Sequence, residues 1–115
     1  MFRALLASIV CLFTLGGCSS SDEDYARWWQ EGILLDTRTP LEHQQSHIDG
    51  SVLVPYELVP QRIAALVPDK NTPVLLYCRS GRRAGIAESA LRDMGYTQVK
   101  NLGSQTQAER ALGLR

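Results

Sequence analysis

Short apolar segments alternate with segments of helical spacing along most of this 115-residue chain. The apolar, β-type segments lie at residues 33–36, 51–55, 73–78 and 98–102. The helical segments lie at residues 25–31, 40–45, 57–67 and 83–95. Strands that alternate with helices are typical of an α/β domain whose largely parallel sheet is buried on both faces. This alternation therefore restricts the chain to the α/β fold class.

The helix predicted at residues 83–95 shows the local signals on which this prediction depends. Four of its apolar residues are expected to share one face: Ile86, Ala90, Leu91 and Met94. Gly95 is a natural stop for this helix. In the preceding helix Pro60 falls in the first turn, where proline is tolerated.

The first 17 residues have the pattern of a secretory signal peptide, because Arg3 precedes an uninterrupted apolar run at residues 4–15. The run leads into the sequence LGGC, residues 15–18, which resembles the bacterial lipobox, where the cysteine becomes the lipid-bearing first residue. We predict three parts: a lipoprotein signal peptide (1–17), lipidated Cys18 with a short polar tether (18–24), and one domain (25–115).

Lipid on Cys18 would hold the protein at a membrane, because two or more acyl chains give stable anchoring. The expected location is the cell envelope, facing the periplasm. Ser19 resembles the outer-membrane sorting pattern of Gram-negative lipoproteins. The alternatives are an ordinary cleaved signal peptide, with Cys18 coincidental, and a retained anchor, for which the apolar run is short.

The chain has three cysteines, and only one is left for chemistry on this interpretation. Cys11 is removed with the signal peptide and Cys18 carries lipid, so Cys78 is the free thiol of the mature chain. Most cysteines in oxidising compartments are paired, so an unpaired one indicates a chemical role. A cysteine kept only for core packing is a weaker explanation, because three arginines follow it closely.

Cys78 ends the predicted strand at residues 73–78, at the edge where open α/β sheets bind ligands. The sequence RSGRR follows and leads directly into a helix, so its backbone N–H groups can bind an anion. These groups and the arginines should lower the pKa of the thiol. A more acidic thiol is also less nucleophilic, and the net gain in reactivity is only about threefold. The loop is therefore expected mainly to bind an anionic substrate or to hold a charged intermediate.

Overall charge and motif content exclude several other functions. Twelve basic residues balance twelve acidic ones, which argues against nucleic-acid binding. The chain has no glycine fingerprint, Walker loop, zinc spacing or C-x-x-C motif, so no cofactor, metal or thioredoxin-like function is predicted. His43 and His47 are four residues apart and could share a helix face as metal ligands, but no third ligand is evident.

Two long motifs in the same order resemble the rhodanese-like sulfurtransferase family. The first consists of Asp36, Arg38, Glu42 and the sequence HIDG at residues 47–50. The second consists of Cys78 opening a six-residue loop with Gly81 at its fourth position, GY at 95–96 and NLG at 101–103. The resemblance covers about residues 32–104 and is greatest to the small, single-domain, exported members.

The resemblance implies a three-layer fold, with a central, mostly parallel sheet flanked by helices, and a persulfide cycle without a cofactor. Cys78 would take sulfur from thiosulfate and pass it to cyanide or another thiol. The implied persulfide cradle is the backbone of Arg79, Ser80, Gly81, Arg82 and Arg83. The three arginines are candidate anion binders, Arg83 foremost. A monomer is expected.

Other motif residues are expected to support the loop. Asp36 and Arg38 are better explained as a pair within the loop network than as an acid and a base. The relatives use the histidine at the position of His47 structurally. The chain departs from the family pattern at Ser46, Asp49 and Ser51, and it has LGS where LGG is frequent. These departures concern substrate preference more than fold.

Two other functions fit part of this pattern. A phosphatase or arsenate reductase also cradles an oxyanion before a helix, but the tyrosine-phosphatase pattern needs arginine six positions after the cysteine, where this chain has Ala84. A tetrahedral phosphate also needs a longer loop. A non-catalytic rhodanese-fold module, acting as a tethered sulfur carrier or binding part, is the alternative from a different class. Retention of Cys78 and Gly81 argues against that module.

Overall fold

Four parallel strands in the order β2–β1–β3–β4 form the centre of the computed structural model, which describes residues 23–115. The strands are β1 (Ile33–Asp36), β2 (Val52–Leu53), β3 (Val74–Cys78) and β4 (Val99–Ser104). All three pairings between neighbours are parallel, which confirms the predicted sheet. The predicted signal peptide (1–17) and the lipid site at Cys18 lie outside the described residues, as does most of the tether (18–24).

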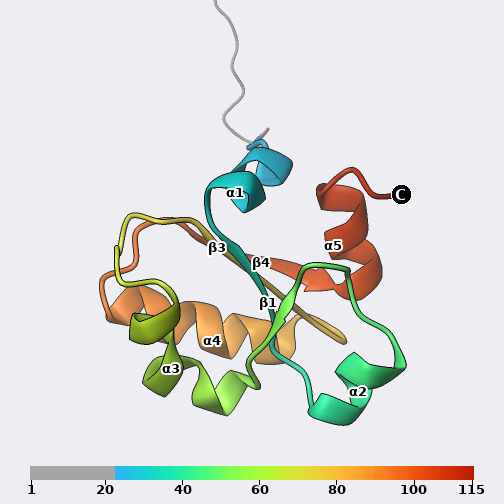
Figure 1. The fold of residues 1–115 in the computed structure, drawn as a ribbon, viewed down its shortest axis with the longest axis horizontal. Coiled ribbons are helices and arrows are strands. Elements are labelled where there is room, and N and C mark those ends of the chain that lie inside the picture. Colours follow the sequence, from blue (N-terminus) through green and yellow to red (C-terminus); the bar gives the residue numbers. More distant parts are fainter. Residues whose placement is uncertain (1–22) are drawn as a thin grey trace, which may run out of the picture.

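Helices cover both faces of this sheet and complete a three-layer α/β fold (Figure 1). The helices are α1 (Tyr25–Glu31), α2 (Pro40–Gln45), α3 (Val59–Leu66), α4 (Arg82–Asp93) and α5 (Gln105–Ala111), with one 3-10 turn, η1 (Tyr56–Leu58). In Figure 1, α1 and α5 lie above the sheet and α3 and α4 lie below it. Helix α5 was not expected, although Ser104 and Gln107 form a capping box at its start.

Strands β1 and β3 are almost entirely apolar because each face of the sheet contacts a separate hydrophobic cluster. Along β1, Leu34 belongs to the cluster under α1 and α5, and Leu35 belongs to the cluster under α3 and α4. Trp28 and Trp29 of α1 pack against the first cluster. The successive residues of a strand point to opposite faces, so an apolar run in this sequence indicates burial on both sides.

Helix α4 contacts the sheet through a different face from the predicted one. Its buried residues are Ala84, Ala87 and Leu91, whereas 46% of Ile86 is exposed. Each helical residue is rotated by about 100° from the last, so a face built on Ala87 and Leu91 points Ile86 away from the sheet. Inclusion of Ile86 in the apolar face was therefore wrong. Termination at Gly95 is confirmed, since Gly95 follows the helix with a φ of 101° and donates to the Arg92 carbonyl.

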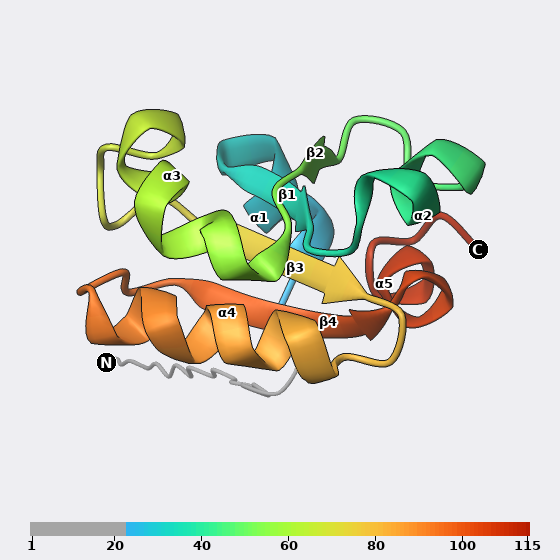
Figure 2. The same cartoon turned by 90° about the horizontal axis from the view of Figure 1, so that it is seen from below.

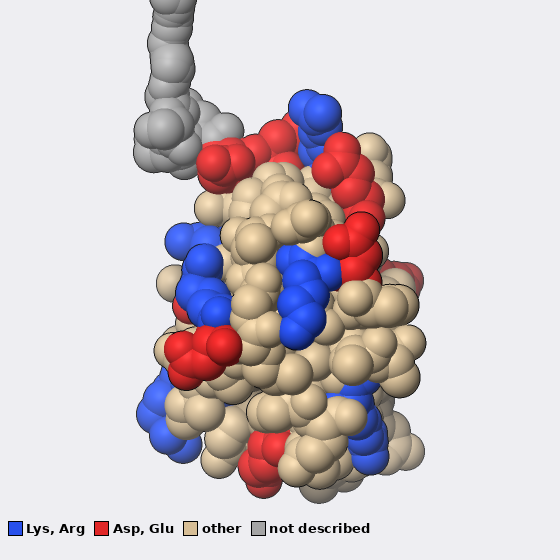
Figure 3. Space-filling model, turned by 90° about the vertical axis from the view of Figure 1, so that its left-hand side faces the viewer, with Lys and Arg blue, Asp and Glu red and all other residues tan. Residues whose placement is uncertain are grey.

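The end of the molecule where the strands begin carries mixed charges (Figure 3). Lys and Arg side chains alternate there with Asp and Glu side chains, in keeping with the net charge of zero. Within residues 23–115, no helix combines the length and apolar content needed to span a membrane.

The face of α4 that packs on the sheet can be tested with two truncations. We expect Leu91→Ala to lower the free energy of unfolding by about 3 kcal/mol, because Leu91 is fully buried. We expect Ile86→Ala to change it by less than about 0.5 kcal/mol, because half of that side chain is in water. Urea unfolding measures both, and equal losses would contradict the assignment.

Candidate active site

Cys78 is the last residue of β3, and the chain turns through Arg79–Gly81 into the first residue of α4, Arg82. In Figure 2 the arrow of β3 points to the end of the molecule where α2 and α5 also lie. This is the carboxyl edge of the parallel sheet, where α/β proteins bind ligands. Cys78 itself is fully buried, at 0% exposure.

Backbone N–H groups surround the sulfur of Cys78. The N–H of Gly81 donates to Sγ at 2.9 Å and the N–H of Ala84 donates at 3.5 Å. Burial alone raises the pKa of the Cys78 thiol, but the backbone N–H groups of Ala84, Ser80, Gly81 and Arg83 outweigh it and lower that pKa. The predicted direction is therefore correct. The donors extend one residue beyond the predicted 79–83 cradle, to Ala84.

Gly81 has a backbone conformation that other residues rarely adopt. Its φ is +98°, in the left-handed region, and it is the residue that precedes α4. A Cβ added there would lie 3.3 Å from the Cα of Gly103. The sharp turn that brings its N–H onto the sulfur therefore requires glycine for both conformation and space.

Arg83 forms a two-pronged ion pair with Glu42 of α2. Its Nη1 and Nη2 donate to Oε1 and Oε2 of Glu42 at 2.9 and 3.0 Å. The hydrogen bonds from the Arg83 guanidinium lower the pKa of Glu42 to about 2. Burial raises that pKa, but its effect is smaller. The Thr39 capping box holds the same carboxylate, since Thr39 N–H donates to its Oε1 at 3.0 Å. The residue most favoured from sequence as an anion binder thus has its charge neutralised within the protein.

Arg79 and Arg82 differ from Arg83 in this respect. Both are exposed, and neither forms an ion pair with another residue of the described range. The Ser80 side chain between them accepts a long bond, from Arg82 N–H to its Oγ at 3.4 Å. Their positive charges therefore stay available at the rim of the loop.

A buried carboxylate cluster lies at the end of the neighbouring strand, β1. Asp36 accepts from Nε and Nη2 of Arg38, both at 2.8 Å, and its Oδ2 lies 2.8 Å from His43 Nδ1. Burial raises the pKa of Asp36, but the bonds from Arg38 and His43 outweigh it and lower that pKa. Arg38 also donates to the Ser46 carbonyl at 2.6 Å. The pair of Asp36 with Arg38 was expected from the sequence, and the participation of His43 was missed.

His43 and His47 stack on one another, with ring centroids 3.7 Å apart. The Nδ1 of His47 lies 2.7 Å from the His43 carbonyl oxygen. Each ring thus has one nitrogen bonded within the protein. Among residues 23–115, no three His, Cys, Asp or Glu side chains converge as a metal site would require.

Ser51, one of the departures from the family pattern, has a structural partner beneath the site. Its Oγ donates to the Ile48 carbonyl at 2.6 Å and accepts from the buried Tyr77 hydroxyl at 3.0 Å. That hydroxyl in turn accepts from Ile48 N–H at 3.1 Å. Ser51 therefore fixes the 47–50 loop to the strand that carries Cys78.

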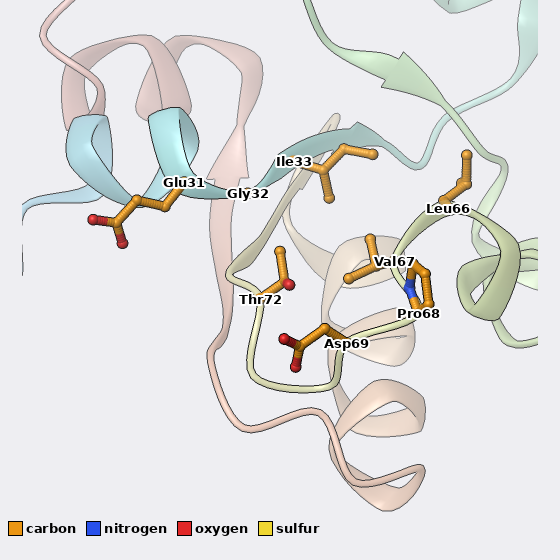
Figure 4. Close-up of a pocket in the computed structure, with 8 residues that line it drawn as sticks. All are labelled: Glu31, Gly32, Ile33, Leu66, Val67, Pro68, Asp69 and Thr72. Atoms are coloured by element: carbon orange, nitrogen blue, oxygen red, sulfur yellow. The ribbon is translucent and has the colours of Figure 1, made fainter.

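Two cavities lie away from Cys78. The first, about 350 Å³, is at the amino ends of the strands (Figure 4). Its lining residues are Glu31, Gly32, Ile33, Leu66, Val67, Pro68, Asp69 and Thr72. The second, about 320 Å³, lies between β2 and α3. Residues 78–84 line neither cavity, so both are separate from the site at the carboxyl edge.

This combination of a cysteine loop, a parallel sheet and an α-helix agrees with the family comparison. The family described as "Rhodanese-like domain" matches residues 21–104. The chain therefore belongs to the rhodanese-like family, as the sequence motifs indicated.

Individual relatives make the comparison more specific. The chain is 46% identical over 69 residues to the Escherichia coli K12 protein named thiosulfate sulfurtransferase PspE, covering 60% of this chain and 66% of that protein. It is 32% identical over 78 residues to the thiosulfate:glutathione sulfurtransferase of Saccharomyces cerevisiae, covering 58% and 56%. The matches thus span just under two thirds of the first relative and less of the second. A solved structure, rhodanese with anions from E. coli, is 42% identical with a TM-score of 0.64, covering 66% of this chain and 89% of that one.

The ion pair of Glu42 and Arg83 predicts a specific pH dependence of stability. The pKa of Glu42 in the folded chain, about 2, is below its ordinary value of 4.5, so the fold favours the ionised carboxylate. The resulting stabilisation is complete above pH 4.5 and is lost as the pH falls through about 2. We expect Glu42→Gln to lower the free energy of unfolding by about 1–2 kcal/mol near neutral pH.

Urea unfolding over a pH series measures the difference between the wild type and Glu42→Gln. The difference should shrink steadily as the pH falls below 4.5. Glu31→Gln is the matched control, because Glu31 pairs with Arg27 on an exposed helix face and should contribute little. A difference that stays constant in acid would show that the carboxylate charge of Glu42 is not its source.

Proposed function

We propose that this chain is a thiosulfate sulfurtransferase that moves sulfane sulfur through a persulfide on Cys78. The observation that carries the proposal is the sulfur of Cys78 at the head of α4, with the Gly81 N–H at 2.9 Å. Membership of the rhodanese-like family supports it, as does the 46% identity to a thiosulfate sulfurtransferase.

The first half of the proposed cycle loads the enzyme. The Cys78 thiolate attacks the outer sulfur of thiosulfate, and a new S–S bond forms. The S–S bond of thiosulfate breaks, and sulfite leaves with the bonding electron pair. One thiolate and one dianion thus become a negatively charged persulfide and the sulfite dianion, so the charge balances.

The second half returns the enzyme to its thiolate. A nucleophilic acceptor attacks the terminal sulfur of the persulfide, and the Cys78 sulfur leaves as thiolate. Cyanide would leave as thiocyanate, and a thiolate acceptor would leave as its own persulfide. A thiol acceptor is supported by the yeast relative, whose name includes glutathione.

The backbone donors suit the charged intermediate better than they suit a neutral thiol. A persulfide is anionic, and preorganised N–H donors stabilise such a charge more than water does when little reorganisation is needed. The donors belong to residues 80, 81, 83 and 84, at the start of α4. Because Cys78 has 0% exposure, the donors of the loop hold the charge of the intermediate away from bulk water.

Arg79 and Arg82 are the arginines that we propose to bind the anionic donor. Both are exposed and carry charges that no carboxylate in the described range neutralises. Arg83 would act mainly through its pair with Glu42, which links α4 to α2. The solved E. coli rhodanese, whose description reads "with anions", supports anion binding by this chain.

The test is turnover of thiosulfate with cyanide by the purified full chain in detergent. Cys78→Ser should abolish thiocyanate release, because the hydroxyl cannot carry the sulfur. In the wild type, thiosulfate alone should add the mass of one sulfur atom to the tryptic peptide 71–79, which contains Cys78. Cys18→Ser is the matched cysteine control and should keep the activity.

The outcomes separate the functions. Turnover and added mass that both depend on Cys78 would support the enzyme. Added mass without turnover would indicate a sulfur carrier that needs a partner as acceptor. The absence of both turnover and added mass would contradict the sulfurtransferase and would favour a non-catalytic binding module.

We also propose that lipid on Cys18 holds the domain at the periplasmic side of the cell envelope. The support is the sequence LGGC at residues 15–18 after an apolar run. In a bacterial host, the wild type should enter the membrane fraction and incorporate labelled palmitate. Cys18→Ser should lose the label, and a wild type without label would contradict lipidation.

A further inference from the structure

The side chain of Asn101, in β4, contacts the loop around Cys78. Its Nδ2 donates to the Gly81 carbonyl at 2.8 Å, and its Oδ1 accepts from the Gly103 N–H at 2.8 Å. One amide thereby joins the cysteine loop to the end of β4. The two bonds need a donor and an acceptor on the same short side chain, which asparagine supplies and aspartate does not.

Asn101 is the last regularly paired residue before a shift in strand pairing. Leu76 of β3 pairs with Asn101, but Cys78, two residues later, pairs with Ser104, three residues later. The extra residue on β4 forms a bulge, which bends the strand and redirects its groups. The backbone N–H of Asn101 also donates to Glu88 Oε2 of α4 at 3.1 Å. Asn101 is thus held by backbone and side chain together.

Three glycines lie next to the Asn101 amide. A Cβ at Gly85 would lie 3.4 Å from the Asn101 Nδ2, and one at Gly81 would lie 3.7 Å from it. Gly103, which donates to the amide, has a φ of +93°. Three glycines from two separate segments therefore surround one polar side chain, which indicates a built arrangement rather than a chance surface contact.

We propose that Asn101 is a positioning residue for Cys78. Glycine at a φ of +98° has wide conformational freedom, so the orientation of Gly81 must be fixed by its partners. Its carbonyl is held by the Asn101 amide and by the Gly85 N–H at 2.9 Å. With the carbonyl side fixed, its own N–H stays directed at the sulfur at 2.9 Å. This inference rests on the proposed function in one respect, which is that Cys78 is the group that reacts.

The test is the pH dependence of alkylation of Cys78 in the full chain in detergent. Iodoacetamide labelling is followed on the tryptic peptide 71–79, so that the other cysteines do not contribute. The midpoint of the curve of alkylation rate against pH reports the pKa of the Cys78 thiol. We expect Asn101→Ala and Asn101→Asp to move this midpoint to higher pH, because a thiolate that loses a hydrogen-bond donor has a higher pKa. Turnover of thiosulfate, as kcat/KM, should fall about tenfold. The midpoint is the primary readout, because a variant that only exposes the thiol more raises the alkylation rate by the same factor at every pH and leaves the midpoint unchanged.

Gln98→Ala is the matched control. The Gln98 Nε2 also donates to a backbone carbonyl, that of Asn71 at 2.7 Å, but before the start of β4. It should leave the alkylation midpoint unchanged. If the Asn101 variants fail to fold, Asn101→Gln keeps the amide but displaces it by one methylene, and it should move the alkylation midpoint in the same direction.

Two results would overturn the proposal. The first is a wild-type midpoint in both Asn101 variants with only a loss of stability, which would make Asn101 purely structural. The second is a shift in Asn101→Asp alone, which would show the effect of the new charge. A wild type that alkylates as expected but does not turn over thiosulfate would refute the proposed function and leave the role of Asn101 standing.

Discussion

A fully buried sulfur that carries negative charge has to receive from the protein the hydrogen bonds that water would otherwise give. The start of α4 supplies them from its backbone, through Gly81 and Ala84. This single requirement explains several local features. Gly81 needs a positive φ to direct its N–H inward, and a Cβ on it would lie only 3.3 Å from the Cα of Gly103. Gly103 itself lies where the pairing of β4 with β3 shifts, between Asn101 and Ser104.

The charges around the loop are arranged so that the carboxylates do not oppose an incoming anion. Asp36 is neutralised by Arg38, and Glu42 is neutralised by Arg83. Both carboxylates have lowered pKa values because of these partners, so they remain ionised and paired at neutral pH. The positive charges that remain at the rim belong to Arg79 and Arg82. An overall net charge of zero thus coexists with a local surplus of positive charge.

Local sequence patterns predicted the strands, four of the five α-helices of the described residues and the place of Cys78. These features depend on residues that are close together in the chain. Apart from α5, whose capping box is a local signal, most of what they missed depends on contacts between distant residues. The partner of Arg83 is 41 residues away and the partner of Gly81 is 20 residues away. Ile86 was misplaced because several faces of α4 carry apolar residues, and only contact with the sheet selects the one with Ala87 and Leu91. The NLG motif at residues 101–103 was the available signal for Asn101.

The bonds around the cysteine loop are distributed unevenly along it. Gly81 is held through its carbonyl by Asn101 and Gly85, and Arg83 is tied to α2 through Glu42. The side chains of Arg79 and Ser80 are exposed, and the one bond to either of them is long, from Arg82 N–H to Ser80 Oγ at 3.4 Å. These side chains are therefore less constrained than the part of the loop from Gly81 to Arg83. The constrained part keeps the N–H donors of Gly81, Arg83 and Ala84 on the sulfur, while the charges of Arg79 and Arg82 lie at the rim of the same loop.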